Sequence, residues 1–253
     1  MKVLSPVCCK CSSGACPRVG GVRPPRTAKK MRMLRMPENT LKDRPHSSVA
    51  VPLLHIHFTM RHNLSETTEL LRDRRSISPE RYSSRKVHKE IVEQVLTNAT
   101  WAPTHGMTQP WRFKAYVGEG MKRIGPKLAE WYAQHAGEQA SASKAAKLEA
   151  RGERVTALVV LGLEPDPNGR ISIEDERMAV ACAAQNMYLT CTAHGIGGFW
   201  STPKFLQLPE VKAFVGLPEN GEVLGIFYMG YPEDGAWPKS HRKPLEYVTD
   251  WNE

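Results

Sequence analysis

The segment 174–200, "EDERMAVACAAQNMYLTCTAHGIGGFW", constrains the fold more than any other part of the chain. Acidic residues open it, where the positive end of a helix dipole favours them. From Met178 to Ala193 nearly every residue is apolar or small, and Gly195 then ends the pattern. A helix that is apolar on every side must be buried on every side. We therefore expect either a central helix or a helix shared with a second subunit.

The first helix before this segment is predicted from a capping pattern. In "RHNLSETTELLRDRRS", Asn63 is the expected N-cap and Glu66 follows at the spacing of a capping box. We expect Leu64, Leu70 and Leu71 to face inward. A second helix is expected over 88–99, because apolar residues recur at helical spacing there until Pro103 stops it.

Strands and further helices alternate after Pro103. Alternating residues predict a strand over 112–117, and continuous apolar runs predict strands over 154–164 and 222–231. Helical surface segments are expected over 121–137 and 142–153. This order indicates an α+β or α/β fold, with a central sheet and helices packed over it.

The positive charge of the chain belongs to its N-terminal tail. The net charge is +9, but residues 1–37 hold nine Lys and Arg and no acid, and the remaining 26 basic residues equal the 26 acidic ones. Residues 1–59 show no sustained helical or strand period, so we expect a disordered basic leader. The leader resembles an organellar transit peptide, a nucleic-acid-binding arm is an alternative, and translation from Met60 is a third interpretation. We favour a leader that is non-functional or absent.

The cysteines do not form a disulfide framework. Four of the six lie in the leader, at spacings unlike a paired C-x-x-C zinc site, although zinc is a possible ligand there. Cys182 and Cys191 lie in the apolar helical segment, where free cysteines behave as small hydrophobes. We expect a reducing, cytoplasmic setting and no membrane span, with an organellar location only if the leader is a genuine transit peptide.

Three short motifs offer groups for ligand binding. Arg74-Arg75-Ser76 combines two guanidinium groups and a hydroxyl, which suit a phosphate, although adjacent arginines also occur on solvated helix ends. The loop "WAPTHGMTQPWRF", residues 101–113, places His105 and Gln109 between rigid prolines and two bracketing tryptophans. "GIGGFWST", residues 195–202, has glycines that allow a close backbone approach and Trp200 as an aromatic wall; a helix cap and turn is the alternative.

Taken together, these motifs resemble the nitroreductase family of flavoproteins. "RRS", "APTHGMTQPWRF", "GIGGFW" and "VLGIFYMGYP" occur in the family's order from about Leu64 to Trp251. The chain is most similar to the YdjA-like branch, whose loop also has a histidine after Ala-Pro. The resemblance implies a nitroreductase-like three-layer α/β/α sandwich of the α+β class. It would have a central, mostly antiparallel sheet, an FMN-binding domain over 60–253 and an intertwined homodimer with two interface sites.

The resemblance also implies a cofactor and a reaction. FMN would be bound, with NADH or NADPH as co-substrate and hydride passing through the flavin to nitroaromatic, quinone or related small-molecule acceptors by a ping-pong mechanism. No side chain need act as a catalytic acid or base, because the cofactor performs the chemistry. No metal, nucleic acid or membrane partner is expected. The implied cofactor-binding residues are Arg74, Arg75, Ser76, His105, Gln109, Gly198, Trp200, Ser201, Thr202, Arg242 and Lys243.

Two departures from the family pattern keep other functions open. Trp101 stands where close relatives often have a basic residue, and Met107-Thr108 replaces a common asparagine before Gln-Pro. A flavin-binding carrier or sensor with little turnover would fit a site weakened in this way. The same fold also supports dehydrogenation, dehalogenation and flavin destruction, since a fold does not fix a function.

Overall fold

A four-stranded antiparallel sheet forms the centre of the computed structural model, which describes residues 61–252. The strand order is β1-β2-β4-β3, and each neighbouring pair is antiparallel. The strands are β1 (Trp111–Val117), β2 (Ala157–Leu163), β3 (Gly197–Ser201) and β4 (Glu222–Gly230). The expected leader, with its four cysteines and Met60, lies outside the described residues.

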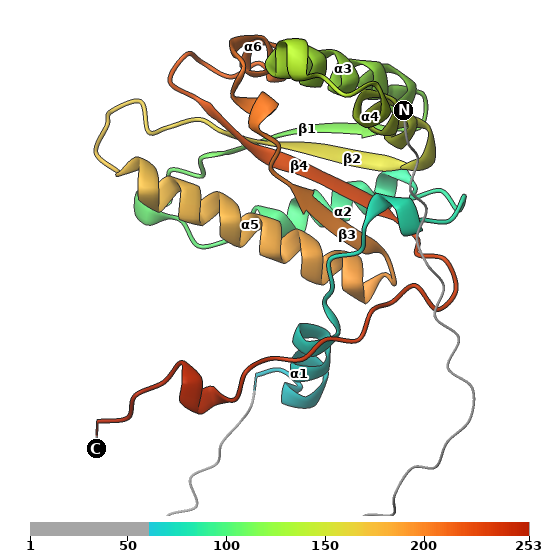
Figure 1. Ribbon diagram of the computed structural model, residues 1–253. Coiled ribbons are helices and arrows are strands. Elements are labelled where there is room, and N and C mark those ends of the chain that lie inside the picture. The colour runs from blue at the N-terminus through green and yellow to red at the C-terminus, as the bar shows by residue number, and fades with distance from the viewer. Residues whose placement is uncertain (1–60, 253) are drawn as a thin grey trace, which may run out of the picture. The chain divides into compact units, whose positions relative to one another are not determined.

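Helices cover both faces of this sheet (Figure 1). One layer contains α3 (Glu119–Ala136), α4 (Ala142–Arg154) and the short α6 (Pro209–Val215). The opposite layer contains α2 (Lys89–Ala99) and α5 (Ile173–Ala193). Two apolar clusters, one on each side of the sheet, join these layers, and every residue of β2 is buried between them. The predicted α+β three-layer sandwich is confirmed.

Helix α1 (Leu64–Asp73) begins as the sequence predicts but packs differently. The Asn63 side chain accepts hydrogen bonds from the backbone N–H groups of Ser65 (3.0 Å) and Glu66 (3.3 Å), which confirms the N-cap. The inward orientation is wrong for Leu64, which is 61% exposed, and for Leu71, which is 53% exposed, whereas Leu70 is partly buried. No residue of α1 is buried, so its apolar side chains find little to pack against within residues 61–252.

Helix α5 is buried on one side only. Ala179, Val180, Ala183 and Met187 contact the core with little or no exposure. Met178, by contrast, is 58% exposed, and Ala181, Cys182 and Leu189 are partly exposed. These positions recur at helical spacing, so together they form a partly uncovered apolar stripe along α5. The sequence predicts that α5 is buried on all sides, but within a single chain only one of its faces is buried.

The strand β3 and the short helix α6 are not predicted from the sequence. Residues 197–201 pair with β4 at the edge of the sheet, where Gly198 lies opposite Met229 and Trp200 opposite Phe227. A Cβ atom on Gly197 would come within 2.9 Å of Ile77, and one on Gly198 within 2.7 Å of the Phe227 ring. The glycines thus serve close packing, whereas glycine-rich sequence suggests a turn.

Residues 77–87 run across one end of the sheet and are fixed by a charged cluster. Glu80 accepts hydrogen bonds from Arg151 at 2.7 and 3.0 Å, and Lys147 lies 3.3 Å away. Desolvation by burial raises the pKa of Glu80, but hydrogen bonds from Ser78 and Arg151 outweigh it and lower the pKa to about 2. The carboxylate therefore stays ionised and anchors this segment to α4.

Residues 61–252 contain neither a membrane-spanning helix nor a cluster of metal-binding side chains. No helix there is both long enough and apolar enough to cross a membrane. No group of three or more His, Cys, Asp or Glu side chains is arranged there to hold a metal ion.

Candidate functional site

The exposed edge of the sheet brings the arginine motif next to β3. Ser76 forms a parallel bridge with Gly198, and the Ile77 N–H donates to the Gly198 carbonyl at 2.9 Å. Side chains of an extended segment alternate between its two sides. Arg74 and Ser76 therefore share one side, and Arg75 lies on the other.

Tyr188 of α5 connects these residues, although no sequence motif singled it out. Its hydroxyl accepts a hydrogen bond from the Trp200 backbone N–H at 2.8 Å and lies 3.1 Å from Ser76 Oγ. The Arg74 guanidinium lies over the Tyr188 ring, 5.2 Å from its centre. The signal in the sequence is a tyrosine within an apolar helix, since a buried hydroxyl needs a hydrogen-bond partner. We call Arg74, Ser76, Tyr188, Gly198 and Trp200 the edge half-site.

The two arginines of the motif have different surroundings. Within residues 61–252, Arg74 has no carboxylate partner, so its guanidinium is available to an anion. Arg75 instead donates to the carbonyls of Pro238 (2.8 Å) and Arg74 (2.8 Å), and also to that of Arg72. Arg75 thus holds the C-terminal segment against the end of α1, and its bonding capacity for a phosphate is reduced.

The glycine-rich motif contributes unequally to this half-site. The Trp200 indole N–H donates to the Leu224 carbonyl at 3.2 Å, which fixes the ring beside the core on the α5 side of the sheet. Ser201 and Thr202 continue the chain beyond Trp200, and Thr202 is exposed. No described side-chain hydrogen bond joins either of them to Arg74 or Ser76.

Arg242 and Lys243 lie a few residues beyond the C-terminal segment that Arg75 holds. Trp237 donates its indole N–H to the Asp73 carbonyl at 3.0 Å, so the chain passes close to the arginine motif there. Both cations are exposed, and their described contacts are local: Arg242 with Ser240 and His241, and Lys243 with the Tyr247 ring. Arg242 and Lys243 therefore follow closely after residues that contact the arginine motif, but neither has a described contact with the edge half-site.

The loop after α2 forms a second cluster, at the other end of α5. His105 Nδ1 lies 2.9 Å from Asp175 Oδ2, and the Gln109 N–H donates to Thr104 Oγ1 at 3.2 Å. This hydrogen bond with His105 holds the pKa of Asp175 below its usual range. We call His105 and Gln109 the loop half-site.

The backbone of this loop is tightly bent, and only one of its bracketing tryptophans is an anchor. Met107 and Gln109 have φ values of +56° and +50°, which are unusual for residues other than glycine. Trp111 is buried, as expected. Trp101 is 81% exposed, so it brackets the loop in the sequence without anchoring it to the core. The helix ends at Ala99, and the following turn carries the indole away from the core.

The two half-sites do not meet within one chain. Asp175 contacts the loop half-site and Tyr188 belongs to the edge half-site, and both lie on α5. The helical rise of 1.5 Å per residue places them about 20 Å apart along the axis. A single chain therefore presents two separate portions of the site that the sequence predicts.

Comparison with known proteins identifies the class to which this fold belongs. Residues 71–231 match the model of the nitroreductase family, and the chain is a member of that family. Among its relatives is YdjA from Escherichia coli (strain K12), by its name a candidate NAD(P)H nitroreductase. That protein is 26% identical over 168 residues, which cover 66% of this chain and 89% of YdjA.

Solved structures place the chain in the same group. A nitroreductase-like family protein from Bacillus cereus superposes with a TM-score of 0.64 at 25% identity, covering 77% of this chain and all of that one. A nitroreductase with bound FMN from Bacteroides fragilis gives a TM-score of 0.54 at 25% identity, covering 74% of this chain and 99% of that one.

The edge half-site has groups that fit an FMN molecule. The Arg74 guanidinium, which has no carboxylate partner within residues 61–252, and the adjacent Ser76 hydroxyl suit a phosphate, since charge-assisted donors bind its oxygens strongly. Trp200, on the same side of the sheet, supplies an aromatic surface for a planar ring system. The donor set of this chain is therefore compatible with the cofactor of its family.

Proposed function

We propose that this protein is an FMN-dependent oxidoreductase that uses NADH or NADPH to reduce nitroaromatic, quinone or related acceptors. Residues 60–253 would form the FMN-binding domain. The observation that supports this most is the edge half-site, where Arg74 is unpaired within the described chain beside the Ser76 and Tyr188 hydroxyls. Bound FMN would accept hydride from the nicotinamide and release it to the acceptor.

The residues of this chain would bind and orient the cofactor. Arg74 would neutralise the phosphate, while Ser76 and Tyr188 would provide hydroxyl groups to its polar tail. Arg242 and Lys243 would add positive charge if the exposed C-terminal segment folds over the phosphate. Trp200 would exclude water from one side of the ring, and Gly198 leaves the adjacent backbone accessible.

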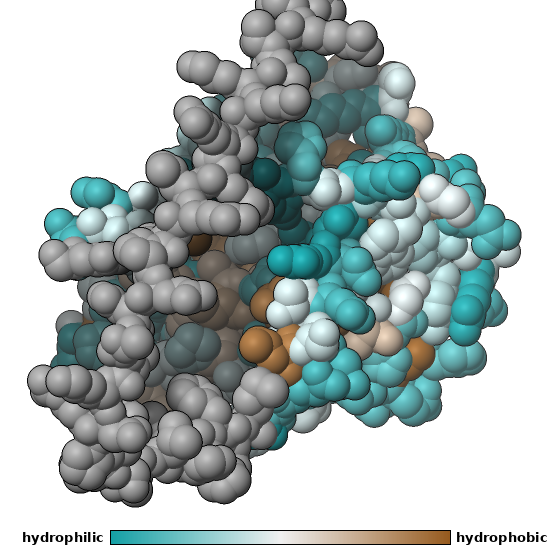
Figure 2. Space-filling model, turned by 90° about the horizontal axis from the view of Figure 1, so that it is seen from below, coloured by the Kyte–Doolittle hydropathy of each residue, from teal (hydrophilic) through white to brown (hydrophobic). Residues whose placement is uncertain are grey.

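The separation of the half-sites supports a homodimer. His105 and Gln109 would approach the flavin of the partner subunit, because about 20 Å of α5 separates them from their own edge half-site. The partly exposed apolar stripe of α5 and the exposed Leu64 and Leu71 of α1 provide a surface for such a partner. Figure 2 shows apolar side chains gathered in the middle of the face seen from below, the side on which α1 lies in Figure 1.

The first test is the pigment of the purified full-length chain. We expect a flavin absorption band, and release of the pigment should yield FMN at about one per chain if each arginine site is filled. Arg74→Ala should weaken FMN binding by about tenfold or more, as loss of a charge-assisted hydrogen bond does. Arg123→Ala removes an exposed arginine elsewhere and serves as the matched control. A colourless chain that does not take up FMN would contradict the proposal.

Steady-state kinetics then separate an enzyme from a carrier. NADH and NADPH oxidation would be followed with 4-nitrobenzoate and with menadione as acceptors. Parallel lines in double-reciprocal plots are expected, because one site would serve donor and acceptor in turn. The alternative of a flavin-binding carrier or sensor rests on Trp101 and Met107-Thr108, which depart from the family pattern and would fit a weakened site. FMN binding with no oxidation above the acceptor-free rate would support that alternative.

A further inference from the structure

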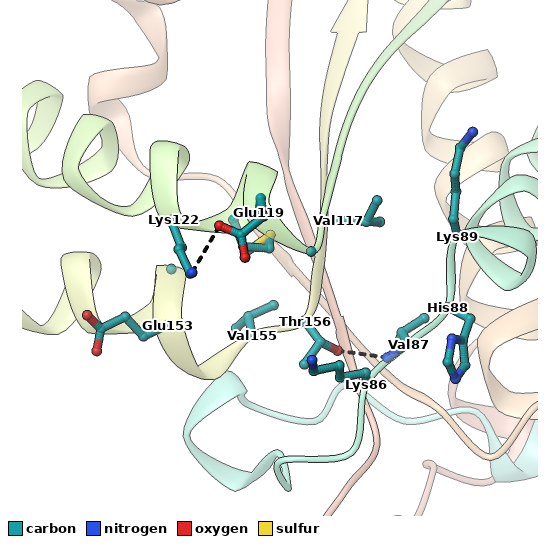
Figure 3. Close-up of a pocket in the computed structure, with 13 residues that line it drawn as sticks. Lys86, Val87, His88, Lys89, Val117, Glu119, Lys122, Glu153, Val155 and Thr156 are labelled. Atoms are coloured by element: carbon teal, nitrogen blue, oxygen red, sulfur yellow. Dashed lines mark hydrogen bonds and ion pairs between the residues drawn. The ribbon is translucent and has the colours of Figure 1, made fainter.

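A cavity lies at the Val117 end of β1 (Figure 3), and the loop half-site lies at the other end of this strand, before Trp111. Its volume is about 540 Å³, within the roughly 300–1,000 Å³ typical of small-molecule sites. The N-terminal ends of α2 and α3, the end of β1, the last turn of α4 and the two residues that precede β2 surround it. Gly152 closes one side, where α4 crosses α3 so tightly that a Cβ atom would lie 2.6 Å from the Gly125 Cα.

The floor of this cavity is apolar. Val87, Met121 and Val155 are buried, and Val117 is partly buried beside them. The Val87 backbone N–H is already satisfied by Thr156 Oγ1 at 3.0 Å. An apolar group entering the cavity would therefore remove apolar surface from water without leaving that donor unpaired.

The charges around the opening favour an anion. Glu119 is neutralised by Lys122 at 2.9 Å, and Lys89 pairs with Glu93 at 3.2 Å outside the cavity. Lys86 has no ion-pair partner within residues 61–252, and in Figure 3 it extends toward Thr156. The remaining carboxylate, Glu153, points away from these residues in the same view.

Backbone groups strengthen the same preference. Both α2 and α3 begin at this cavity, and neither has a side-chain hydrogen bond at its N-cap, His88 and Gly118 respectively. The last turn of α4, at Gly152 and Glu153, also borders the cavity and presents one negative dipole end. The N–H groups and positive dipole ends of two helices outnumber it and add to the charge of Lys86.

We propose that this cavity binds a small amphipathic carboxylate, with its hydrocarbon chain on the valine floor and its carboxylate at Lys86. The site shares no residue with either half-site and is independent of the proposed flavin chemistry. It opens at the Val117 end of β1, whereas the loop half-site precedes the strand at Trp111.

Isothermal titration of the full-length chain with octanoate tests this proposal. We expect one site per chain, and an affinity at least tenfold above those of acetate, which lacks the chain, and octylammonium, which has the opposite charge. Lys86→Ala should weaken octanoate binding about tenfold, the loss of one charge-assisted contact. Val117→Phe should prevent binding by filling the cavity. If Val117→Phe does not fold, the Lys86→Ala result decides alone.

Two control variants locate the binding. Lys127→Ala removes a lysine of α3 that does not line the cavity, and Arg74→Ala alters the flavin site instead. Neither should change the octanoate affinity. Equal affinity for octanoate and octylammonium, full affinity in Lys86→Ala, or loss of affinity in Arg74→Ala would overturn the proposal.

Discussion

The edge half-site and the loop half-site are held in place by different means. Long-range backbone hydrogen bonds fix the edge half-site: Ser76 is bridged to Gly198, and the Tyr188 hydroxyl joins two chain segments. The loop half-site is held within this chain by an exposed contact between His105 and Asp175 and by a local bond to Thr104. Buried and networked hydrogen bonds resist displacement far better than exposed ones.

This difference indicates which half is rigid before a ligand binds. The edge half-site has one arrangement set by sheet pairing, so it can fix the position of a phosphate. The loop that carries the loop half-site has two residues with positive φ, Met107 and Gln109, a strained conformation that surrounding contacts must maintain. We therefore expect the loop to adapt to the partner subunit and to the acceptor.

The largest effect should come from filling the space at Gly198. In Gly198→Ala the new methyl group would lie 2.7 Å from the Phe227 ring and 3.0 Å from that of Tyr188, and both rings are buried. Such overpacking lowers the free energy of unfolding by about 3 kcal/mol and should displace Tyr188 from Ser76. Urea unfolding and FMN titration would measure the two losses.

Gly120→Ala provides the matched control for this substitution. Its methyl group would meet Tyr116 at 3.7 Å, an ordinary contact, and alanine favours the helix there. We expect its stability to be equal to or above that of the unmodified chain. A Gly198→Ala protein as stable as Gly120→Ala would show that the edge is less rigid than its packing indicates.

The second largest effect is expected from replacing Arg75, and it should differ from the effect of replacing the neighbouring Arg74. Arg75→Ala removes hydrogen bonds to three backbone carbonyls and should lower the free energy of unfolding by about 2 kcal/mol. Its FMN affinity should fall less than that of Arg74→Ala, whose guanidinium has no such bonds. Unfolding midpoints and FMN titrations of both variants would check this. If Arg75→Ala instead lost more FMN affinity and Arg74→Ala more stability, Arg75 would be the phosphate ligand and Arg74 the structural residue.

A smaller effect is expected from the hydroxyl that joins the edge half-site. Tyr188→Phe keeps the ring packed on Phe227 but leaves the Trp200 N–H without its acceptor. The free energy of unfolding should fall by about 1 kcal/mol, with a modest loss of FMN affinity. Tyr247→Phe, which changes an exposed tyrosine, should alter neither quantity. Equal unfolding midpoints for the two variants would contradict a structural role for the Tyr188 hydroxyl.

The sequence predicts the elements with a strong period and misses those set by distant partners. Helix α2 and strand β2 follow directly from apolar spacing and from a buried run of β-forming residues. The glycines of residues 195–202 indicate a close backbone approach or a helix cap and turn. Neither interpretation predicts strand β3, because its pairing with β4 and with Ser76 cannot be seen in the local sequence. The outward-facing leucines of α1 have the same origin, since an amphipathic pattern does not say what covers the helix.

The candidate site shows the same division. The three motifs identify Arg74, Ser76 and Trp200 because their chemistry is visible in the residue types. Tyr188 was missed because its hydroxyl gains importance only where α5 passes the sheet edge. The contrast between Arg74 and Arg75 was also hidden, since the alternation of an extended segment and the position of Pro238 decide it.

The smallest effect concerns the anchor of the loop half-site and depends on pH. The hydrogen bond with His105 lowers the pKa of Asp175 below its ordinary value. A carboxylate with a lowered folded-state pKa stabilises the fold above its unfolded-state pKa and loses this effect as the pH falls through the folded value. The contact should therefore persist at neutral pH and break in acid, releasing the loop. The NMR signals of the His105 ring, followed from neutral pH into acid, would report this.

Asp175→Asn tests whether this contact is what holds the loop. The variant should show the released loop at neutral pH and no change in loop mobility as the acid range is entered, while the global unfolding midpoint stays nearly constant because the pair is exposed. Glu174→Gln, at the adjacent position on α5, should keep the loop anchored and its acid release intact. A loop that remains ordered in Asp175→Asn would mean that the backbone itself, with its positive φ values at Met107 and Gln109, fixes the conformation. The two half-sites would then be equally rigid and would differ only in how exposed their contacts are.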